Sequence, residues 1–379
     1  MNHANGMNFI SRVCIAGLFI SFFFSGFAIA TPFKVETIVA GLEHPWALAF
    51  LPDGRLLVTE RGGHLRIIKQ GKLLPNPVEG LPLIEPIGQG GLLDIVLHPD
   101  YQNNGWLYFS YAEPDKGVFF SEYGTAVARA RLDGSRLKDL QVIFSMNKKS
   151  GGGRHFGSRL VFDRDNYLYI TVGDRGERMR AQDLNDHAGS VIRLHDDGRI
   201  PTDNPFVNTA NARPEIYSYG HRNPQGLALH PATGEVWLHE HGPQGGDEIN
   251  RILPGRNYGW PVITFGENYV TGTRIGEGTH KQGMEQPIHQ WTPSIAPSGM
   301  AFYSGRGFDE WQGSLFVGAL KFQLLARIEL RNNHVINEER LLERQLGRIR
   351  DVRNGPDGFL YLLTDADDGA VVRLVPGRQ

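Results

Sequence analysis

The chain has 379 residues, of which 21% are charged, and its formal net charge of −2 excludes the strong basic bias typical of proteins that bind nucleic acid. Its 47 glycines exceed the usual share of about 7% of residues. An excess of glycine indicates many tight turns, so the composition favours an all-β protein built from short strands.

The N-terminal segment is predicted to be an export signal rather than part of the fold. Arg12 precedes the apolar run 13–24, and residues 28–30 (Ala-Ile-Ala) have the small-x-small pattern that signal peptidases cleave. The expected organisation is a cleaved signal peptide over 1–30 and a single domain over 31–379. An uncleaved membrane anchor is the alternative, although the apolar run is short for a membrane span.

The only cysteine, Cys14, lies inside this predicted signal, and Arg12 and Val13 before it do not resemble a lipoprotein cleavage box. The mature chain would therefore contain no thiol, which excludes disulfides and a cysteine nucleophile. Export to a bacterial periplasm is the simplest interpretation, with no integral membrane segment after cleavage.

From Thr31 onward the sequence repeats a unit of constant design. Each unit has an apolar alternation, a turn that contains Asp-Gly, Asn or Gly, a second aromatic-rich alternation and a later strand that contains arginine. Three strands are clear in each unit, and there is room for a fourth. The six units begin, in chain order, near Ala47, Asp94, Leu160, Leu227, Met300 and Val352.

Six such sheets arranged radially form a six-bladed β-propeller, which protects strand edges by repetition. The segment 34–39 precedes the first unit and is expected to close the ring by pairing with the last one. The middle units exceed the roughly 40 to 50 residues that a four-stranded blade needs. Their surplus loops are either functional or merely tolerated at the surface.

Five units place a polar residue just before the innermost strand, where the loops of a propeller converge on one end of the channel. A lone histidine is more often structural than catalytic, but this recurrence favours a shared site. The residues are Gln89, His155, Arg222 with Asn223, Ser298, and Arg348 with Arg350.

Arg348 and Arg350 are two residues apart, so a strand would direct both side chains to one face. Two guanidinium groups on a channel-facing side suit a ligand with several carboxylates, because each grips a carboxylate through two parallel donors. Lys321 is a candidate third cation. The alternative for each residue is a solvated or salt-bridged surface charge.

The segment 241–248 is a glycine-rich turn followed by two acids. Its carbonyl and carboxylate oxygens are ligands that Ca²⁺ accepts, although the spacing alone is a weak signal and no EF-hand loop is present. The sequence also lacks the His-Glu-x-x-His zinc helix, the Gly-x-Ser-x-Gly nucleophile elbow and the Gly-Lys-Ser/Thr phosphate loop.

Taken together, these motifs resemble one family over residues 33–375: the soluble periplasmic aldose sugar dehydrogenases that use pyrroloquinoline quinone (PQQ), relatives of soluble PQQ glucose dehydrogenase. The resemblance rests on the combination rather than on any single motif. The matching segments are 46–50 (WALAF), 88–94 (GQGGLLD), 220–226 (GHRNPQG), 240–243 (EHGP), 247–250 (DEIN) and 257–261 (NYGWP).

The resemblance implies a six-bladed propeller that oxidises aldoses at the anomeric carbon to lactones. It implies that His155 is the general base, with Arg222 stabilising charge on oxygen. It further implies a catalytic Ca²⁺ on the carbonyls of Gly242 and Pro243 and a structural Ca²⁺ at Glu248 and Tyr258. The residues assigned to PQQ are Gln89, Arg222, Asn223, Ser298, Lys321, Arg348 and Arg350.

One position departs from the family pattern. The glucose enzyme has an acid directly before its catalytic histidine, whereas this chain has Arg154. What orients His155 is therefore left open, and the neighbouring cation is expected to lower the pKa of the imidazole.

Two other functions remain compatible with the repeats and motifs. A Ca²⁺-dependent propeller hydrolase, such as a lactonase, would use metal-activated water, and a non-catalytic propeller would bind a partner on its rim. For the dehydrogenase, the expected partners are an aldose and a separate electron acceptor, but not nucleic acid. The protein is expected to be a monomer or a homodimer.

Overall fold

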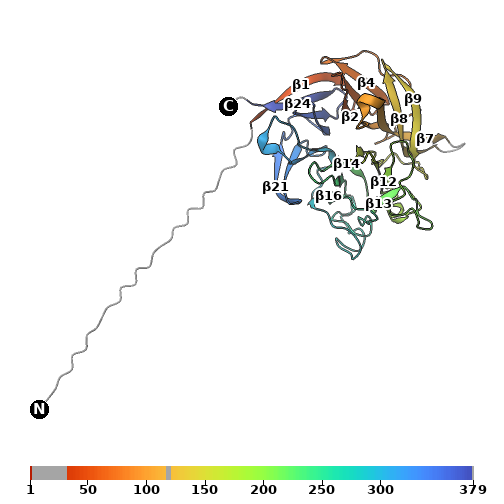
Figure 1. Ribbon diagram of the computed structural model, residues 1–379. Coiled ribbons are helices and arrows are strands. Elements are labelled where there is room, and N and C mark those ends of the chain that lie inside the picture. The colour runs from red at the N-terminus through yellow and green to blue at the C-terminus, as the bar shows by residue number, and fades with distance from the viewer. Residues whose placement is uncertain (2–31, 117–120, 378–379) are drawn as a thin grey trace. The chain divides into compact units, whose positions relative to one another are not determined.

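The computed structural model describes residues 1, 32–116 and 121–377. In this part of the chain, six four-stranded antiparallel sheets are arranged in a ring around a central channel (Figure 1). The protein is a six-bladed β-propeller, which confirms the predicted fold class. The predicted signal peptide, apart from Met1, lies outside the described residues.

The blades follow the chain in order, and each begins with the strand next to the channel. Blade one contains β2 (Pro45–Phe50), β3 (Leu56–Glu60), β4 (His64–Lys69) and β5 (Lys72–Leu73). Blade two contains β6 (Leu92–Leu97), β7 (Trp106–Lys116), β8 (Ser121–Asp133) and β9 (Arg136–Ser145). Blade three contains β10 (Leu160–Phe162), β11 (Leu168–Val172), β12 (Ser190–Leu194) and β13 (Ile216–Tyr219).

The remaining three blades have the same order. Blade four contains β14 (Pro224–Leu229), β15 (Val236–Glu240), β16 (Asp247–Arg251) and β17 (His289–Trp291). Blade five contains β18 (Pro297–Phe302), β19 (Leu315–Ala319), β20 (Leu325–Arg331) and β21 (His334–Leu341). Blade six contains β22 (Ile349–Asn354), β23 (Leu360–Thr364), β24 (Gly369–Pro376) and, as its outer strand, β1 (Phe33–Leu42).

The two ends of the propeller are joined in blade six. Strand β1 pairs antiparallel with β24, from Phe33 opposite Pro376 to Leu42 opposite Gly369, and the two strands lie side by side in Figure 1. This pairing confirms the closure predicted for residues 34–39. It also covers a strand edge that would otherwise present unpaired N–H and C=O groups to solvent.

The turn between the first and second strands of each blade explains why the six-fold repeat can be recognised in the sequence. In every blade this turn holds one residue with positive φ, a conformation that glycine and asparagine tolerate best. These residues are Gly54, Gly105, Asn166, Gly234, Gly313 and Gly358.

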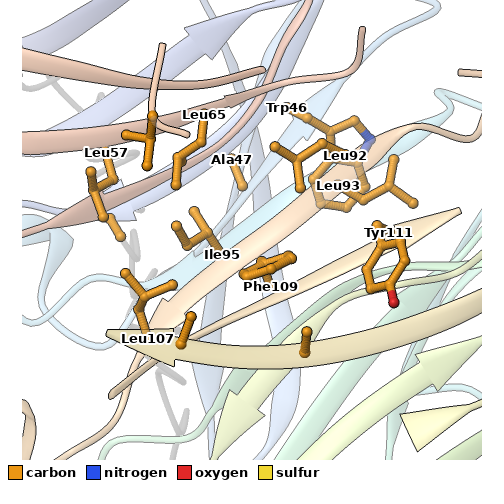
Figure 2. Close-up of a cluster of buried hydrophobic side chains, with 14 of the residues drawn as sticks. Trp46, Ala47, Leu57, Leu65, Leu92, Leu93, Ile95, Leu107, Phe109 and Tyr111 are labelled. Atoms are coloured by element: carbon orange, nitrogen blue, oxygen red, sulfur yellow. The ribbon is translucent and has the colours of Figure 1, made fainter. Parts of the chain in front are cut away.

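The hydrophobic core lies between neighbouring blades rather than at the centre of the ring. Between blades one and two, Trp46, Leu57 and Leu65 pack toward Ile95 and Phe109, all at most 2% exposed (Figure 2). Burial of such a side chain stabilises the fold by about 1.5 to 3 kcal/mol. The apolar residues that alternate along each strand therefore pack neighbouring blades together.

A layer of ion pairs links innermost strands of different blades at the channel. Arg159 Nη1 lies 2.8 Å from Asp351 Oδ1, Arg353 Nε lies 2.8 Å from Asp351 Oδ2, and Arg353 Nη2 lies 2.5 Å from Asp94 Oδ1. These residues belong to blades two, three and six, so the layer ties distant parts of the ring together. On one side of it lies an apolar cavity of about 460 Å³, whose only titratable lining residue is Arg353.

Helical structure is scarce in the described ranges. It consists of α1 (Tyr101–Asn104) and two 3₁₀ turns, η1 (Arg178–Gln182) and η2 (Asp309–Trp311). None of the helices in these ranges has the length and hydropathy needed to cross a membrane.

Candidate active site

The predicted polar residues gather at the end of the channel where the innermost strands begin. Gln89 precedes β6, His155 precedes β10, and Arg222 and Asn223 precede β14, while Arg350 lies at the start of β22. Hydrogen bonds connect them across blade boundaries, as between Gln89 and His155 in blades two and three. The structure thus brings together residues that are more than 250 positions apart in sequence.

His155 is held in an uncommon backbone conformation, with φ at +51°. A non-glycine residue in this region is strained and persists only where its surroundings impose it. Two contacts do so: its backbone N–H donates to Gln89 Oε1 at 2.8 Å, and Nδ1 lies 2.6 Å from Asp174 Oδ1. The imidazole therefore has a fixed orientation, with a side chain 12% exposed.

Asp174, rather than the residue directly before His155, supplies the carboxylate that orients the imidazole. It follows β11 in the same blade as His155 and is completely buried. Its Oδ1 also accepts the N–H of Gly176 at 2.7 Å, and its Oδ2 accepts Nε1 of Trp260 at 2.7 Å. A carboxylate held at both oxygens can orient an imidazole with little freedom of its own.

The charge states of this pair follow from burial and from each other. Burial lowers the pKa of His155, with help from the Arg222 charge, although the hydrogen bond that Nδ1 donates to Asp174 opposes this. Burial would raise the pKa of Asp174, but the contacts with His155, Gly176 and Arg222 outweigh it and lower that pKa. Near neutral pH, His155 is thus a neutral imidazole that donates Nδ1–H to a carboxylate.

The second ring nitrogen of His155 is the one available for chemistry. Within the described residues, Nε2 makes no hydrogen bond, whereas Nδ1 is engaged by Asp174. A neutral imidazole with a free Nε2 lone pair is a proton acceptor. This arrangement matches the geometry required of a general base.

Arg222 lies between His155 and the glycine-rich turn. Its side chain is 8% exposed, and Nη1 donates to the carbonyls of His241 at 3.1 Å and Gly242 at 2.8 Å. The backbone N–H of Arg222 donates to Glu240 Oε2 at 2.5 Å. Among the described residues, its Nε is buried without a partner and its Nη2 makes no hydrogen bond, so Nη2 remains available to a bound group.

The turn from Gly242 to Gly246 presents its carbonyls in a confined geometry. A Cβ atom on Gly242 would lie 2.2 Å from the carbonyl oxygen of Gly245, so only glycine fits there. The Gly242 N–H donates to Asp247 Oδ1 at 2.9 Å, and the Pro243 carbonyl accepts the Tyr269 hydroxyl at 2.8 Å. Burial raises the pKa of Asp247 to about 6.

Two carboxylates face each other beside this turn. Glu240 on β15 and Glu248 on β16 are directly opposite in the strand register, and like charges in such a pair repel. Burial and the charge of Glu240 raise the pKa of Glu248. The two acids line a cavity of about 10 Å³, room for a single water or ion, together with Gly242, Gly246 and Tyr258.

The chemistry of this cavity fits a hard cation. A cation would neutralise the facing carboxylates, and carbonyl oxygens complete the kind of ligand set that Ca²⁺ takes. The Tyr258 hydroxyl already donates to the Arg251 carbonyl at 2.5 Å and accepts the Leu253 N–H at 2.9 Å. Tyr258 is thus suited to contribute its carbonyl rather than its hydroxyl.

Side chains alone do not form a metal site here. The described residues contain no cluster of three or more His, Cys, Asp or Glu side chains arranged to hold a metal ion. A cation would therefore depend on backbone carbonyls in addition to Glu240 and Glu248.

The predicted cationic residues lie at the same end of the channel. Arg348 Nη2 and Arg350 Nη2 reach one oxygen, Asp365 Oδ2, at 3.0 and 2.9 Å, so both side chains share a face as their spacing predicts. Lys321 is exposed, and its Nζ lies 5.6 Å from the ring centroid of Phe322. In the described structure it makes no ion pair.

Asn223 and Ser298 are more enclosed than the other predicted residues. Asn223 is 2% exposed, and its Oδ1 accepts Gly157 N–H and Gln225 Nε2, each at 3.3 Å. Ser298 is completely buried, and its hydroxyl donates to the Ile349 carbonyl at 2.6 Å across blades five and six. Both residues thus serve contacts between blades.

Sequence reasoning missed Asp174, Trp260 and Glu240. Asp174 lies shortly after β11, in the Gly173-Asp174-Arg175-Gly176 segment of an overlong unit, and this position was the available signal. Trp260 and Tyr269 lie in the long connection between β16 and β17. The surplus loops predicted for the middle units therefore do line the site.

Comparisons with known proteins identify the family of this chain. The family model for glucose / sorbosone dehydrogenase matches residues 42–373. Aldose sugar dehydrogenase YliI from Escherichia coli is 47% identical over 349 residues, which cover 90% of this chain and 93% of the relative.

Two solved structures are similar over the same region. The apo-form of the soluble aldose sugar dehydrogenase from Escherichia coli is 46% identical with a TM-score of 0.87, covering 91% of this chain and 100% of that one. The PQQ-bound form of the aldose sugar dehydrogenase from Streptomyces coelicolor is 29% identical with a TM-score of 0.72, with the same coverage.

Proposed function

The chain belongs to the glucose / sorbosone dehydrogenase family, and from this premise we propose that it oxidises aldose sugars at the anomeric carbon to lactones, with PQQ and Ca²⁺ as cofactors. The observation that carries the proposal is the His155–Asp174 pair, 2.6 Å apart at the channel mouth. It supplies an oriented base where the candidate cofactor ligands converge.

In this proposal, Nε2 of His155 removes the proton of the anomeric hydroxyl. Asp174 keeps the proton of the neutral imidazole on Nδ1 and stabilises the imidazolium that forms. Arg222 supports the reaction from the other side, because its guanidinium can stabilise negative charge that develops on oxygen. Its Nη2, which makes no hydrogen bond among the described residues, is the donor proposed for this role.

PQQ, when bound, supplies the two-electron acceptor for the hydride from the anomeric carbon, and Ca²⁺ supplies Lewis acidity. The role of the protein is to bind and orient the cofactor. Lys321, Arg348 and Arg350 are the cations suited to the PQQ carboxylates, and Gln89, Arg222 and Asn223 complete the proposed set. Ser298 would have to release the Ile349 carbonyl before its hydroxyl could donate to the cofactor.

The residues proposed for Ca²⁺ form two groups. The carbonyls of Gly242 and Pro243 are proposed for the catalytic ion, and each already accepts one hydrogen bond, which leaves a second lone pair. Glu248 and the Tyr258 carbonyl are proposed for the structural ion. The opposed carboxylate of Glu240 supports this second assignment.

We further propose that residues 1–30 direct export to the periplasm and that 31–379 is the catalytic domain. Electrons would then pass from the reduced cofactor to a separate acceptor. The test is reconstitution of the purified protein with PQQ and Ca²⁺, followed by dye reduction with a panel of aldoses and by absorption spectra before and after sugar. Absence of both cofactor binding and turnover would sink the proposal.

A further inference from the structure

The strongest unassigned feature near the site is the anion that the two arginines share. Asp365 Oδ2 accepts Arg348 Nη2 at 3.0 Å and Arg350 Nη2 at 2.9 Å. Arg350 has a side chain only 10% exposed, whereas Arg348 is 46% exposed. A single carboxylate thus joins one buried guanidinium and one that faces solvent.

Asp365 is itself firmly held. It lies in the turn between β23 and β24, is 8% exposed, and donates its backbone N–H to the Arg348 carbonyl at 2.8 Å. Its second oxygen, Oδ1, lies 2.9 Å from His44 Nδ1. Burial opposes its ionisation, but the charge of Arg350 and the His44 contact outweigh burial and lower the pKa of Asp365.

His44 fixes this turn from the other end of the chain. It lies between β1 and β2, and its backbone N–H donates to the Ala366 carbonyl at 2.9 Å. Its Nε2 lies 2.8 Å from Asp367 Oδ1 on the same turn. The carboxylate of Asp365 is therefore anchored at the closure of the ring, where residues from both ends of the chain meet.

Two adjacent guanidinium groups repel each other, and a shared carboxylate is what permits them to approach. Without it, the exposed Arg348 would gain hydration by turning toward solvent, and the pair would lose its fixed spacing. A pair that is already ordered before a ligand arrives pays less entropy when it binds a carboxylate. Arg348 Nη1 has no hydrogen bond within the described residues and remains available.

We propose that Asp365, anchored by His44, is a positioning residue that holds Arg348 and Arg350 as a preformed receptor for the carboxylates of the cofactor. The proposal rests on the proposed function, in which these arginines bind PQQ. It assigns the affinity for the cofactor partly to a residue that does not touch it. It also couples the cofactor site to the closure of the propeller.

The test is the dissociation constant of PQQ, measured by quenching of tryptophan fluorescence in the full-length protein at constant Ca²⁺. Asp365→Ala is expected to raise the dissociation constant at least about tenfold, because a charge-assisted pair is lost. Asp367→Ala is the matched control: this residue lies on the same turn and contacts His44, but it contacts neither arginine. It should change the constant less than about twofold.

Two further variants separate positioning from folding. Asp365→Asn keeps the shape and removes the charge, so it should raise the constant even if the alanine variant does not fold. His44→Asn retains a donor near the Nδ1 position and should bind PQQ more tightly than His44→Ala. Thermal unfolding midpoints recorded in parallel show whether a variant is merely destabilised.

The outcomes distinguish this inference from the proposed function. If Asp365→Ala and Asp365→Asn bind PQQ as tightly as the wild type, or more tightly, the positioning role is overturned while the proposed function stands. A lower unfolding midpoint with unchanged affinity overturns it as well. If the wild-type protein does not bind PQQ, both proposals fall.

Discussion

Nδ1 of His155 lies 2.6 Å from Oδ1 of Asp174, and these residues come from different loops of the same blade. The residue directly before His155 is Arg154, which cannot accept a hydrogen bond from the imidazole. Asp174 therefore provides the orienting carboxylate from 19 residues further along the chain. Its own ties to Trp260 and Gly176 make the pair rigid.

Replacement of His155 tests the assigned base. His155→Ala should lower kcat by about 10² to 10⁴, the usual contribution of a general base, while PQQ binding and thermal stability change little. Steady-state dye reduction at saturating PQQ and Ca²⁺ measures the effect. A variant with the wild-type rate would remove His155 from the mechanism.

Replacement of Asp174 tests the orientation of the base and its titration together. Because the pKa of His155 is lowered, activity should persist below the usual imidazole pKa of about 6.5 and fall only at lower pH. Asp174→Asn removes the carboxylate charge that raises this pKa and leaves a neutral, weaker acceptor, so the acid limb should move to still lower pH, and kcat should fall by about 10-fold or more. The pH profile of kcat/KM records both changes.

Asp165→Asn serves as the control for this prediction, because Asp165 is an exposed aspartate in the same blade. Its pH profile should match that of the wild type. An unshifted acid limb in Asp174→Asn would mean that Asp174 does not control the titration of the base.

The opposed carboxylates of Glu240 and Glu248 predict a response to Ca²⁺ in the absence of PQQ. An ion bound only by the folded state should raise the unfolding midpoint of the wild type by about 3 °C or more at saturation. Glu248→Gln should lose this shift, and without Ca²⁺ it should be about as stable as the wild type, since burial and the charge of Glu240 raise the pKa of Glu248 to about 8 and glutamine resembles the protonated acid.

Differential scanning fluorimetry with and without Ca²⁺ measures both effects. Glu277→Gln is the control, because Glu277 is an exposed carboxylate that pairs with Lys281. Equal Ca²⁺ shifts in Glu248→Gln and in the wild type would place the ion elsewhere.

The charge layer in the channel predicts a stability difference between two ion pairs of equal length. Arg159–Asp351 and Lys281–Glu277 both have N–O distances of 2.8 Å, but only the first is buried. Asp351→Ala leaves Asp94 as the only carboxylate within the described residues that pairs with the Arg159 and Arg353 guanidinium groups, and this charge imbalance should lower the free energy of unfolding by about 3 to 5 kcal/mol. Glu277→Ala should lower it by less than about 1 kcal/mol.

Urea denaturation followed by circular dichroism gives these free energies. Equal values for the two variants would show that the channel layer does not stabilise the ring more than a surface pair does.

The fold could be predicted from the sequence because each blade is formed by residues that are close together in the chain. The turn after the first strand needs positive φ, and the chain places glycine or asparagine there in all six blades. Fourth strands were harder to locate: β5 has only two residues, and β17 follows a long connection. Such strands have too few residues to show an alternating pattern.

The candidate site was accessible only in part. The position before each innermost strand is fixed by the repeat, and there the residue types indicated Gln89, His155 and Arg222. Asp174 and Glu240 were missed, since nothing in a linear sequence shows which carboxylate reaches which base or faces which acid. Ser298 shows the converse, because a polar residue at an equivalent position lies buried against the Ile349 carbonyl.

The number of blades, the closing strand and the residue types at the channel mouth could all be predicted from the amino-acid order, because they follow from local turns and strand alternation. Tertiary structure alone decided that Asp174 orients His155, that Glu240 opposes Glu248 and that Asp365 joins two arginines to His44. The physical reason is that hydrogen bonds and ion pairs act over about 3 Å, and the folded ring sets those distances between residues as far apart as His44 and Asp365.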